Sequence, residues 1–222
     1  MKTILYIDGF NLYYGCLKNS SDKWLDLHKL FSGILNEHNP ETEIIKIKFF
    51  TANIRANIAT HKELAQKSQQ DYHKALKQIH GDKIEIISNY FSLEKAVLPK
   101  YQKPIDKNCN VAVWKLEEKK TDVDLALSAY RDVSLNKAEQ IVFVSNDSDI
   151  EPSLRYIKDD FPNKVIGVII PKRKNSKRAM GNSLVQFSNW SRSYISDNEL
   201  SNAPLPIKIP TNKKPIFKPD YW

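Results

Sequence analysis

The chain alternates short, nearly continuous apolar runs with longer segments in which apolar residues recur at every third or fourth position. The runs are rich in β-branched and aromatic residues, which is typical of strands covered on both faces. The predicted strands are Thr3–Asp8, Ile44–Thr51, Lys83–Ser88, Gln140–Ser145 and Lys164–Ile170, and the predicted helices are Leu25–Asn36, Thr60–Ile79, Val123–Arg131 and Ile150–Asp159. Strands that alternate with helices in this way predict an α/β fold with a doubly wound, mostly parallel sheet.

Two parts of the chain depart from this alternation. Asn108–Glu118 has an extended pattern and predicts an edge strand or a hairpin arm, and Glu94–Lys107, with two prolines and four lysines, predicts an excursion loop before it. After Ser191 the chain is rich in Ser, Asn, Pro and Lys, which predicts an extended or partly disordered tail. We therefore expect one domain in residues 1–190 and a Pro/Lys-rich extension in residues 191–222.

Composition excludes several classes of protein. Hydrophobic residues make up 41% of the 222 residues, enough for the core of one sizeable domain. No apolar run approaches the roughly 18 to 20 residues of a membrane span, so we expect no membrane partner and a cytoplasmic location. The two cysteines, Cys16 and Cys109, lack any CxxC or Cys/His spacing, which excludes a disulfide scaffold and a conventional zinc site.

Positive charge is concentrated near the C-terminus. Residues 1–170 contain 24 basic and 23 acidic residues, whereas residues 171–222 contain 10 basic and 3 acidic residues. Such asymmetry favours a polyanionic partner, although a solvated basic tail explains it equally well.

Four aspartates follow predicted strands or open a predicted helix. Asp8 ends the first strand, Asp147 and Asp149 follow the strand that begins at Gln140, and Asp122 opens the helix after the segment that ends at Glu118. Because loops at the carboxyl ends of parallel strands meet at one edge, we expect the four carboxylates to lie together. Clustered carboxylates repel one another unless a cation joins them, and Mg²⁺ or Mn²⁺ prefers such oxygen ligands.

Each aspartate also has a purely structural explanation. Asp8 suits a turn with Gly9, Asp122 suits the positive end of a helix, and Asp147 suits a helix N-cap. Asp124 is best explained by a capping box with Thr121. Asn11 either orients a bound water or phosphate or caps its helix. The apolar residues around Asn11 are expected to be core residues of a first helix: Phe10, Leu12, Tyr13 and Tyr14.

Three sequence blocks resemble the NYN-domain proteins of the PIN-like nuclease superfamily. They are YIDGFNLYYG at Tyr6–Gly15, EEKKTDVDLAL at Glu117–Leu127 and VFVSNDSDIEPSLRYI at Val142–Ile157, and the resemblance covers about residues 1–190. It implies a three-layer α/β/α domain and a divalent-metal ribonuclease. The residues that match the family's acidic and asparagine positions are Asp8, Asn11, Asp122, Asp147 and Asp149.

The resemblance also concerns the residues before Asp122. Glu118 and Lys119 match the family's pattern, but Lys120 stands where a small residue is usual. This leaves open whether Lys119 or Lys120 reaches the substrate.

Further residues are assigned to substrate binding because they lie next to the predicted acidic edge. Ser145 and Asn146 precede Asp147, and five cations follow the last strand: Lys172, Arg173, Lys174, Lys177 and Arg178. We expect the cations to neutralise RNA phosphates. Tyr101 either stacks on a base or belongs to a solvated loop. The terminal IFKPDYW segment is compatible with RNA binding, with docking on the domain, or with contact to a second copy.

The leading hypothesis is a ribonuclease that hydrolyses RNA phosphodiester bonds endonucleolytically. It uses Mg²⁺ or Mn²⁺, held by Asp8, Asp122, Asp147 and Asp149. The main alternative is a non-catalytic RNA-binding module of the same fold. A more distant alternative is an NADH-dependent pyridine hydroxylase, since some relatives with the YIDGFNLYYG opening carry that label. The chain has no GxGxxG motif and only six glycines to form a phosphate-binding loop. A second copy of the chain or a regulatory protein is left open as a partner.

Overall fold

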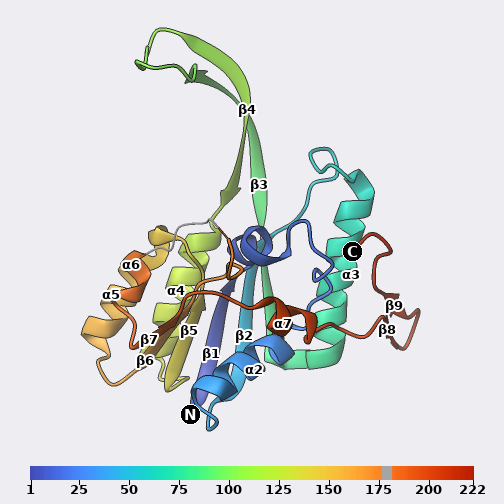
Figure 1. Cartoon of the computed structure of the whole chain (residues 1–222), viewed down its shortest axis with the longest axis vertical. Helices are drawn as coiled ribbons and strands as arrows, with labels where there is room; N and C mark the ends of the chain where they lie inside the picture. Colours follow the sequence, from blue (N-terminus) through green and yellow to red (C-terminus); the bar gives the residue numbers. More distant parts are fainter. Residues whose placement is uncertain (177–181) are drawn as a thin grey trace.

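A central sheet organises the chain (Figure 1). In the computed structural model, which describes residues 1–176 and 182–222, the sheet has seven strands in the order β4-β3-β2-β1-β5-β6-β7. The strands are β1 Lys2–Asp8, β2 Glu43–Ala52, β3 Ile84–Pro99, β4 Asn110–Lys119, β5 Gln140–Val144, β6 Val165–Ile169 and β7 Trp190–Arg192. Every neighbouring pair is parallel except β3 and β4. The predicted α/β fold with a mostly parallel sheet is confirmed.

The helices lie on both faces of this sheet. They are α1 Gly9–Leu12 with a π-helical turn at Tyr13–Leu17, α2 Leu27–His38, α3 Lys62–His80, α4 Thr121–Ser134, α5 Glu151–Asp160, α6 Asn182–Val185 and α7 Asp197–Ser201. All four helices predicted from the sequence are present as α2 to α5. None of the helices in the described residues is long and apolar enough to cross a membrane.

Alternation along β1 separates the core into two clusters. Leu5 and Ile7 pack with the apolar faces of α2 and α3, whereas Ile4 and Tyr6 pack with those of α4 and α5. Successive side chains of a strand point to opposite faces of its sheet, so a strand buried on both faces must be apolar throughout. This explains the uninterrupted apolar run that predicted β1.

Strands β3 and β4 continue beyond the sheet as a two-stranded arm that projects from the body (Figure 1). The prediction of a loop over Glu94–Lys107 is wrong in its first part, because β3 runs to Pro99 and its residues from Tyr90 to Pro99 pair with β4. The arm is held by antiparallel backbone pairing rather than by burial, and Trp114 is 72% exposed. Its side chains therefore lack the apolar alternation by which a strand is predicted.

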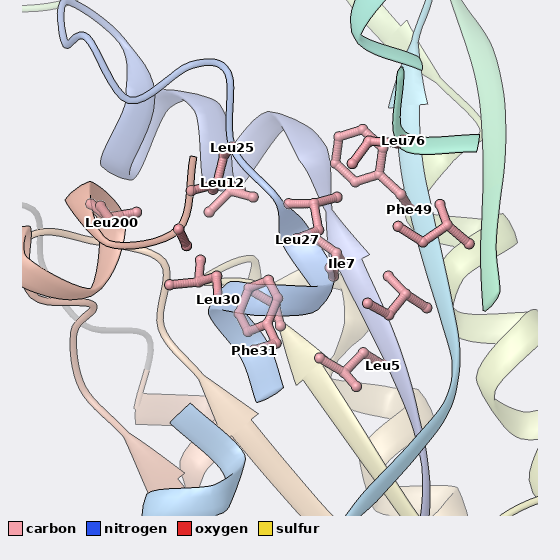
Figure 2. Close-up of a cluster of buried hydrophobic side chains, with 14 of the residues drawn as sticks. Leu5, Ile7, Leu12, Leu25, Leu27, Leu30, Phe31, Phe49, Leu76 and Leu200 are labelled. Carbon is pink, nitrogen blue, oxygen red and sulfur yellow. The ribbon is translucent and has the colours of Figure 1, made fainter. Parts of the chain in front are cut away.

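The segment after Ser191 packs against the body, so the prediction of an extended tail is wrong. It forms α7 and a short hairpin of β8 (Lys208–Ile209) and β9 (Ile216–Phe217). Its apolar residues Leu200, Leu205 and Ile209 belong to the same core cluster as α2, and Figure 2 shows Leu200 there with Leu30. This packing was not predicted because the segment has few apolar residues and prolines separate them.

Candidate active site

The central pairing of β1 with β5 brings the first and third sequence blocks together. Ile7 lies opposite Val144 in this parallel pair, so Asp8 and Ser145 leave the sheet side by side. Ser145 Oγ donates to Asp8 Oδ2 at 2.9 Å. Asp8 is only 2% exposed, and it is the N-cap of α1 through a 2.8 Å hydrogen bond from the Asn11 backbone N–H.

Asn11 and Gly9 support this turn. The side-chain amide of Asn11 donates to Asp8 Oδ2, so Asn11 holds the carboxylate as well as the helix start. A Cβ on Gly9 would meet the Phe50 carbonyl oxygen at 2.7 Å, and glycine is therefore required where α1 approaches β2.

The loop after β5 is ordered by the same side chains. The Asp147 backbone N–H donates to Ser145 Oγ at 3.0 Å, and the Asp149 backbone N–H donates to Asp147 Oδ1 at 3.0 Å. Asn146 and Asp147 are half-buried, and Asp149 is exposed. Asp147 is the N-cap of the short 3₁₀ turn Ser148–Ile150, as its structural explanation required.

Asp122 enters from the first turn of α4. Burial, together with the negative charges of Asp8, Asp147, Glu118 and Asp149, raises its pKa to about 6. Burial also raises the pKa of Asp8, against the hydrogen bonds from Asn11 and Ser145, and Asp147 adds to the rise. The four predicted aspartates therefore share one electrostatic environment.

Glu118, at the end of β4, is a member of this environment that the sequence did not assign to the site. Burial raises its pKa, a hydrogen bond from Thr121 opposes this, and the charge of Asp8 adds to the rise. The Thr121 hydroxyl donates to Glu118 Oε1 at 2.5 Å. The sequence feature that could have identified Glu118 as a site residue is its position at the end of an extended segment, three residues before a helix.

The predicted capping box of Thr121 and Asp124 does not form. Lys120, in a left-handed conformation, is the N-cap of α4, and it provides no side-chain cap. Asp124 instead accepts a 3.0 Å hydrogen bond from Asn89 on β3. The Thr121 hydroxyl donates to Glu118 and accepts a 3.5 Å hydrogen bond from the Asn89 side-chain amide.

The predicted cations are distributed over several places. Lys119 pairs with Glu117, on the strand face opposite to Glu118, and Lys120 Nζ lies 5.7 Å from the centre of the Tyr90 ring. Lys172 and Lys174 follow β6 at the carboxyl edge of the sheet, next to β5. Lys177 and Arg178 lie outside the described residues.

Arg173 is engaged elsewhere. Its guanidinium pairs with Asp22 at 2.5 Å and with Asp197, and its Nε donates to the Cys16 carbonyl at 2.9 Å. These contacts connect the segment after α1 to the C-terminal segment. We therefore leave Arg173 out of the substrate-binding residues proposed below.

Three of the four residues around Asn11 that were predicted to be core residues, Phe10, Tyr13 and Tyr14, are exposed. Only Leu12 is buried, whereas Phe10 is 42% and Tyr14 is 47% exposed, and Tyr13 is exposed as well. The turn Tyr13–Leu17 is π-helical, and the wider turn presents these rings at the surface beside Phe91.

The donor chemistry of the acidic site suits a hard divalent cation. In the described residues, no lysine or arginine forms an ion pair with any of the four aspartates. The same residues contain no group of three or more Asp, Glu, His or Cys side chains that could hold a metal ion. Mg²⁺ is commonly held by one or two carboxylates, with waters and substrate phosphates as its other ligands, so an incomplete set of protein ligands fits it.

An acidic cluster at the carboxyl edge of a parallel α/β sheet is the arrangement of a nuclease-type fold. The chain belongs to the NYN domain family, whose profile matches residues 2–190. It is 36% identical over its whole length to the 6-hydroxy-3-succinoylpyridine 3-monooxygenase of Pseudomonas putida, of which it spans 75%. In fold it is similar to a protein of unknown function from Vibrio parahaemolyticus, with a TM-score of 0.51, 18% identity and coverage of 89% of this chain and 94% of the other.

Proposed function

We propose that the protein is a ribonuclease that depends on Mg²⁺ or Mn²⁺ and hydrolyses RNA phosphodiester bonds endonucleolytically in a PIN-like, three-layer α/β/α domain. The observation that carries the proposal is the shared negative environment of Asp8, Asp122, Asp147 and Asp149, which come from distant parts of the sequence. Membership of the NYN domain family supports it.

The chain's own residues have distinct tasks in this proposal. Asp8, Asp122, Asp147 and Asp149 would hold the cation. Ser145 and Asn11 orient Asp8, and Lys172 and Lys174 attract phosphates to the same edge of the sheet. When bound, the cation supplies positive charge for the transition state of phosphodiester cleavage and activates the attacking water.

Purified protein incubated with single-stranded RNA and Mn²⁺ tests the proposal. Cleavage is expected to require the metal and to be lost in Asp8→Asn and in Asp147→Asn, while both variants still bind RNA. Asp159→Asn, an exposed acid at the end of α5, is the matched control and should cleave normally. Undiminished cleavage by the two site variants would overturn the assignment, and binding without cleavage in the wild type would identify a non-catalytic RNA-binding module.

A second candidate is hydroxylation of a pyridine ring, which the name of the Pseudomonas putida relative favours. Hydroxylation of an unsubstituted ring carbon converts a ring C–H, O₂, NADH and a proton into the ring C–OH, water and NAD⁺. Loss of NADH absorbance with a hydroxypyridine, matched by formation of the hydroxylated product, would support it. Absence of product with active RNA cleavage would exclude it.

A further inference from the structure

A cavity of about 400 Å³ lies beside α1. It begins at Gly9, directly after Asp8, and extends between the π-helical turn, α3 and the loop of residues 53–61. Its volume is within the range of small-molecule sites in proteins.

Several aromatic side chains line the cavity. The buried Phe49 and Tyr72 lie at its base, and the exposed rings of the first sequence block lie at its entrance. The centres of the Phe10 and Tyr14 rings are 4.5 Å apart, and those of Phe10 and Phe91 are 6.4 Å apart. Flat apolar walls of this kind favour a planar ligand, because aromatic rings stack on or meet one another edge to face.

Two polar side chains in the cavity are available to a ligand. Among the described residues, neither the Thr51 hydroxyl nor the His73 ring has a hydrogen-bond partner. Burial, helped by the charge of Lys77, lowers the pKa of His73 to about 4, so its imidazole is neutral at pH 7 and has both a donor and an acceptor. A few polar groups in an apolar cavity are what orients a small ligand.

The charge of the cavity is positive. Its side chains include two permanent cations, Lys23 and Arg55, and no Asp or Glu. Arg55 Nη1 donates to the Phe91 carbonyl at 3.1 Å, which places the guanidinium beside the entrance.

Hydrogen bonds hold the wall of the cavity in place. The Gln69 side chain on α3 accepts from the Ile54 N–H at 2.8 Å and donates to the Ala52 carbonyl at 2.9 Å. The loop is thereby fastened to the helix at the point where both line the cavity. A wall fixed before binding lowers the entropic cost of holding a ligand.

We infer that this cavity binds a planar heteroaromatic ring that carries an anionic group. The ring stacks among the aromatic side chains, Thr51 and His73 hydrogen-bond to its edge, and Lys23 and Arg55 face the anion. Such a ring is either the base of a ribonucleotide or a free aromatic acid. The site does not depend on the carboxylates, although a ribonucleotide base there would deepen the ribonuclease proposal.

Isothermal titration with defined probes tests this inference. The probes are uridine and adenosine 5′-monophosphate, pyridine-3-carboxylate, neutral pyridine, and cyclohexanecarboxylate, which has the charge without the flat ring. At least one of the three ring anions should bind saturably, and at least about tenfold more tightly than pyridine or cyclohexanecarboxylate. Binding of the nucleotides alone would identify an RNA base as the source, and binding of the pyridine acid alone would identify a free metabolite.

Paired variants locate the binding. Ala65→Trp fills the cavity from α3 and should weaken binding by at least about tenfold, whereas Leu64→Trp, at an exposed neighbour that does not line it, should not. Thr51→Val is a smaller change that should still weaken binding if Ala65→Trp does not fold. Equal binding by wild type, Ala65→Trp and Thr51→Val, or no saturable binding of any ring anion, would overturn the inference.

The Asp8→Asn variant separates this inference from the proposed function. It should bind the ring anion as the wild type does, because Asp8 does not line the cavity. A protein that cleaves RNA but binds no ring anion contradicts only the cavity inference, and a protein that binds the ring anion without cleaving RNA contradicts only the ribonuclease.

Discussion

Single carboxylates in this chain have opposite electrostatic environments. The Asp122 carboxylate is surrounded by other acids, whereas Asp132, three turns further along α4, is surrounded by donors. Asp132 accepts from Tyr6 Oη at 2.9 Å and pairs with Lys48 at 2.5 Å and Lys137 at 2.9 Å. Burial alone would raise the pKa of Asp132, but these partners outweigh it and lower the pKa. A carboxylate that already pairs with lysine side chains has a structural role, whereas a carboxylate without such partners is suited to bind a metal cation.

Removal of the Asp132 carboxylate should therefore destabilise the fold. Asp132→Ala leaves the Lys48 ammonium, whose side chain is 13% exposed, without its partner. We expect the free energy of unfolding in urea to fall by about 3 kcal/mol. Asp132→Leu combined with Lys48→Met should recover most of the loss, since the poorly solvated Lys48 charge is removed and the Lys137 side chain, which is half exposed, stays in contact with water. A fall of less than about 0.5 kcal/mol, the range of an exposed surface substitution, would contradict this account of the cluster.

The neutral imidazole of His73 should make stability depend on pH. Its pKa is about 4 in the folded chain, below the usual 6.5, so between these values the unfolded chain binds the extra proton. The contribution is complete above about pH 6.5 and is lost as the pH falls toward 4, by at most about 3 kcal/mol.

Urea unfolding of wild type and His73→Phe from pH 7 to 4.5 measures this contribution. The difference between the two proteins should change with pH in favour of the variant as the medium becomes acidic. The subtraction removes other titrating groups, including Asp122, whose raised pKa acts in the opposite direction. A difference that is constant with pH would contradict a neutral His73.

At the scale of elements, the C-terminal segment shows that a core can extend beyond the repeated strand–helix pattern. The segment passes over the face of the sheet that α2 covers, and the Leu205 N–H donates to the Trp24 carbonyl at 2.9 Å. Trp222 packs against Tyr72 of α3, with ring centres 5.9 Å apart, and against the same core cluster. The sequence left three possibilities open for the terminal IFKPDYW segment: RNA binding, docking on the domain, and contact with a second copy. In the structure the segment docks on the domain.

Two isoleucines in this segment provide a matched pair. Ile209 is 3% exposed and belongs to the core cluster, whereas Ile207, two residues earlier, is 74% exposed. Ile209→Ala should lower the free energy of unfolding by about 2 to 4 kcal/mol, and Ile207→Ala should change it by less than about 0.5 kcal/mol. Equal effects in thermal or urea unfolding would show that the segment does not contribute to the core.

Strands and helices were predictable from the sequence where burial makes apolar residues recur at regular positions or in a continuous run. The strands β1, β2, β5 and β6 and the helices α2 to α5 were found because each has an apolar face or an apolar run. The arm was only partly found, since backbone pairing leaves no such period in β3 beyond the sheet. Glu118 was missed and the exposed aromatic rings were assigned to the core, because the placement of those side chains depends on contacts between distant segments.

At the scale of the whole molecule, the topology of the sheet explains why the acidic residues were predictable. A central β1 beside β5 places their ends together, and this order is a common consequence of parallel α/β connections. The positive charge near the C-terminus was less informative, because the segment that contains it packs across the body and Arg173 is consumed in ion pairs. Net charge predicts the kind of partner but not the surface that the partner contacts.

The path of RNA over the molecule can be found from two similar lysines. Lys174 follows β6 near the acidic edge and lies 5.8 Å from the centre of the Tyr194 ring, and Lys208 in β8 lies 5.9 Å from that of Phe217. If RNA follows the acidic edge, as we propose, only Lys174 neutralises a phosphate. Each phosphate contact to a single strand contributes about −0.7 to the slope of log K against log salt concentration.

RNA affinity measured between low and moderate salt in the Asp8→Asn background, which prevents cleavage, tests this path. Lys174→Gln should weaken binding and make the slope less negative by about 0.7, because one fewer counterion is released on binding. Lys208→Gln removes the same charge and a similar ring contact, but Lys208 lies away from the acidic edge of the sheet. This variant should therefore leave the slope of log K against log salt concentration unchanged. The reverse result would move the RNA path to the C-terminal hairpin, where a strand crossing the body would meet α3 and the aromatic cavity rather than the carboxylates.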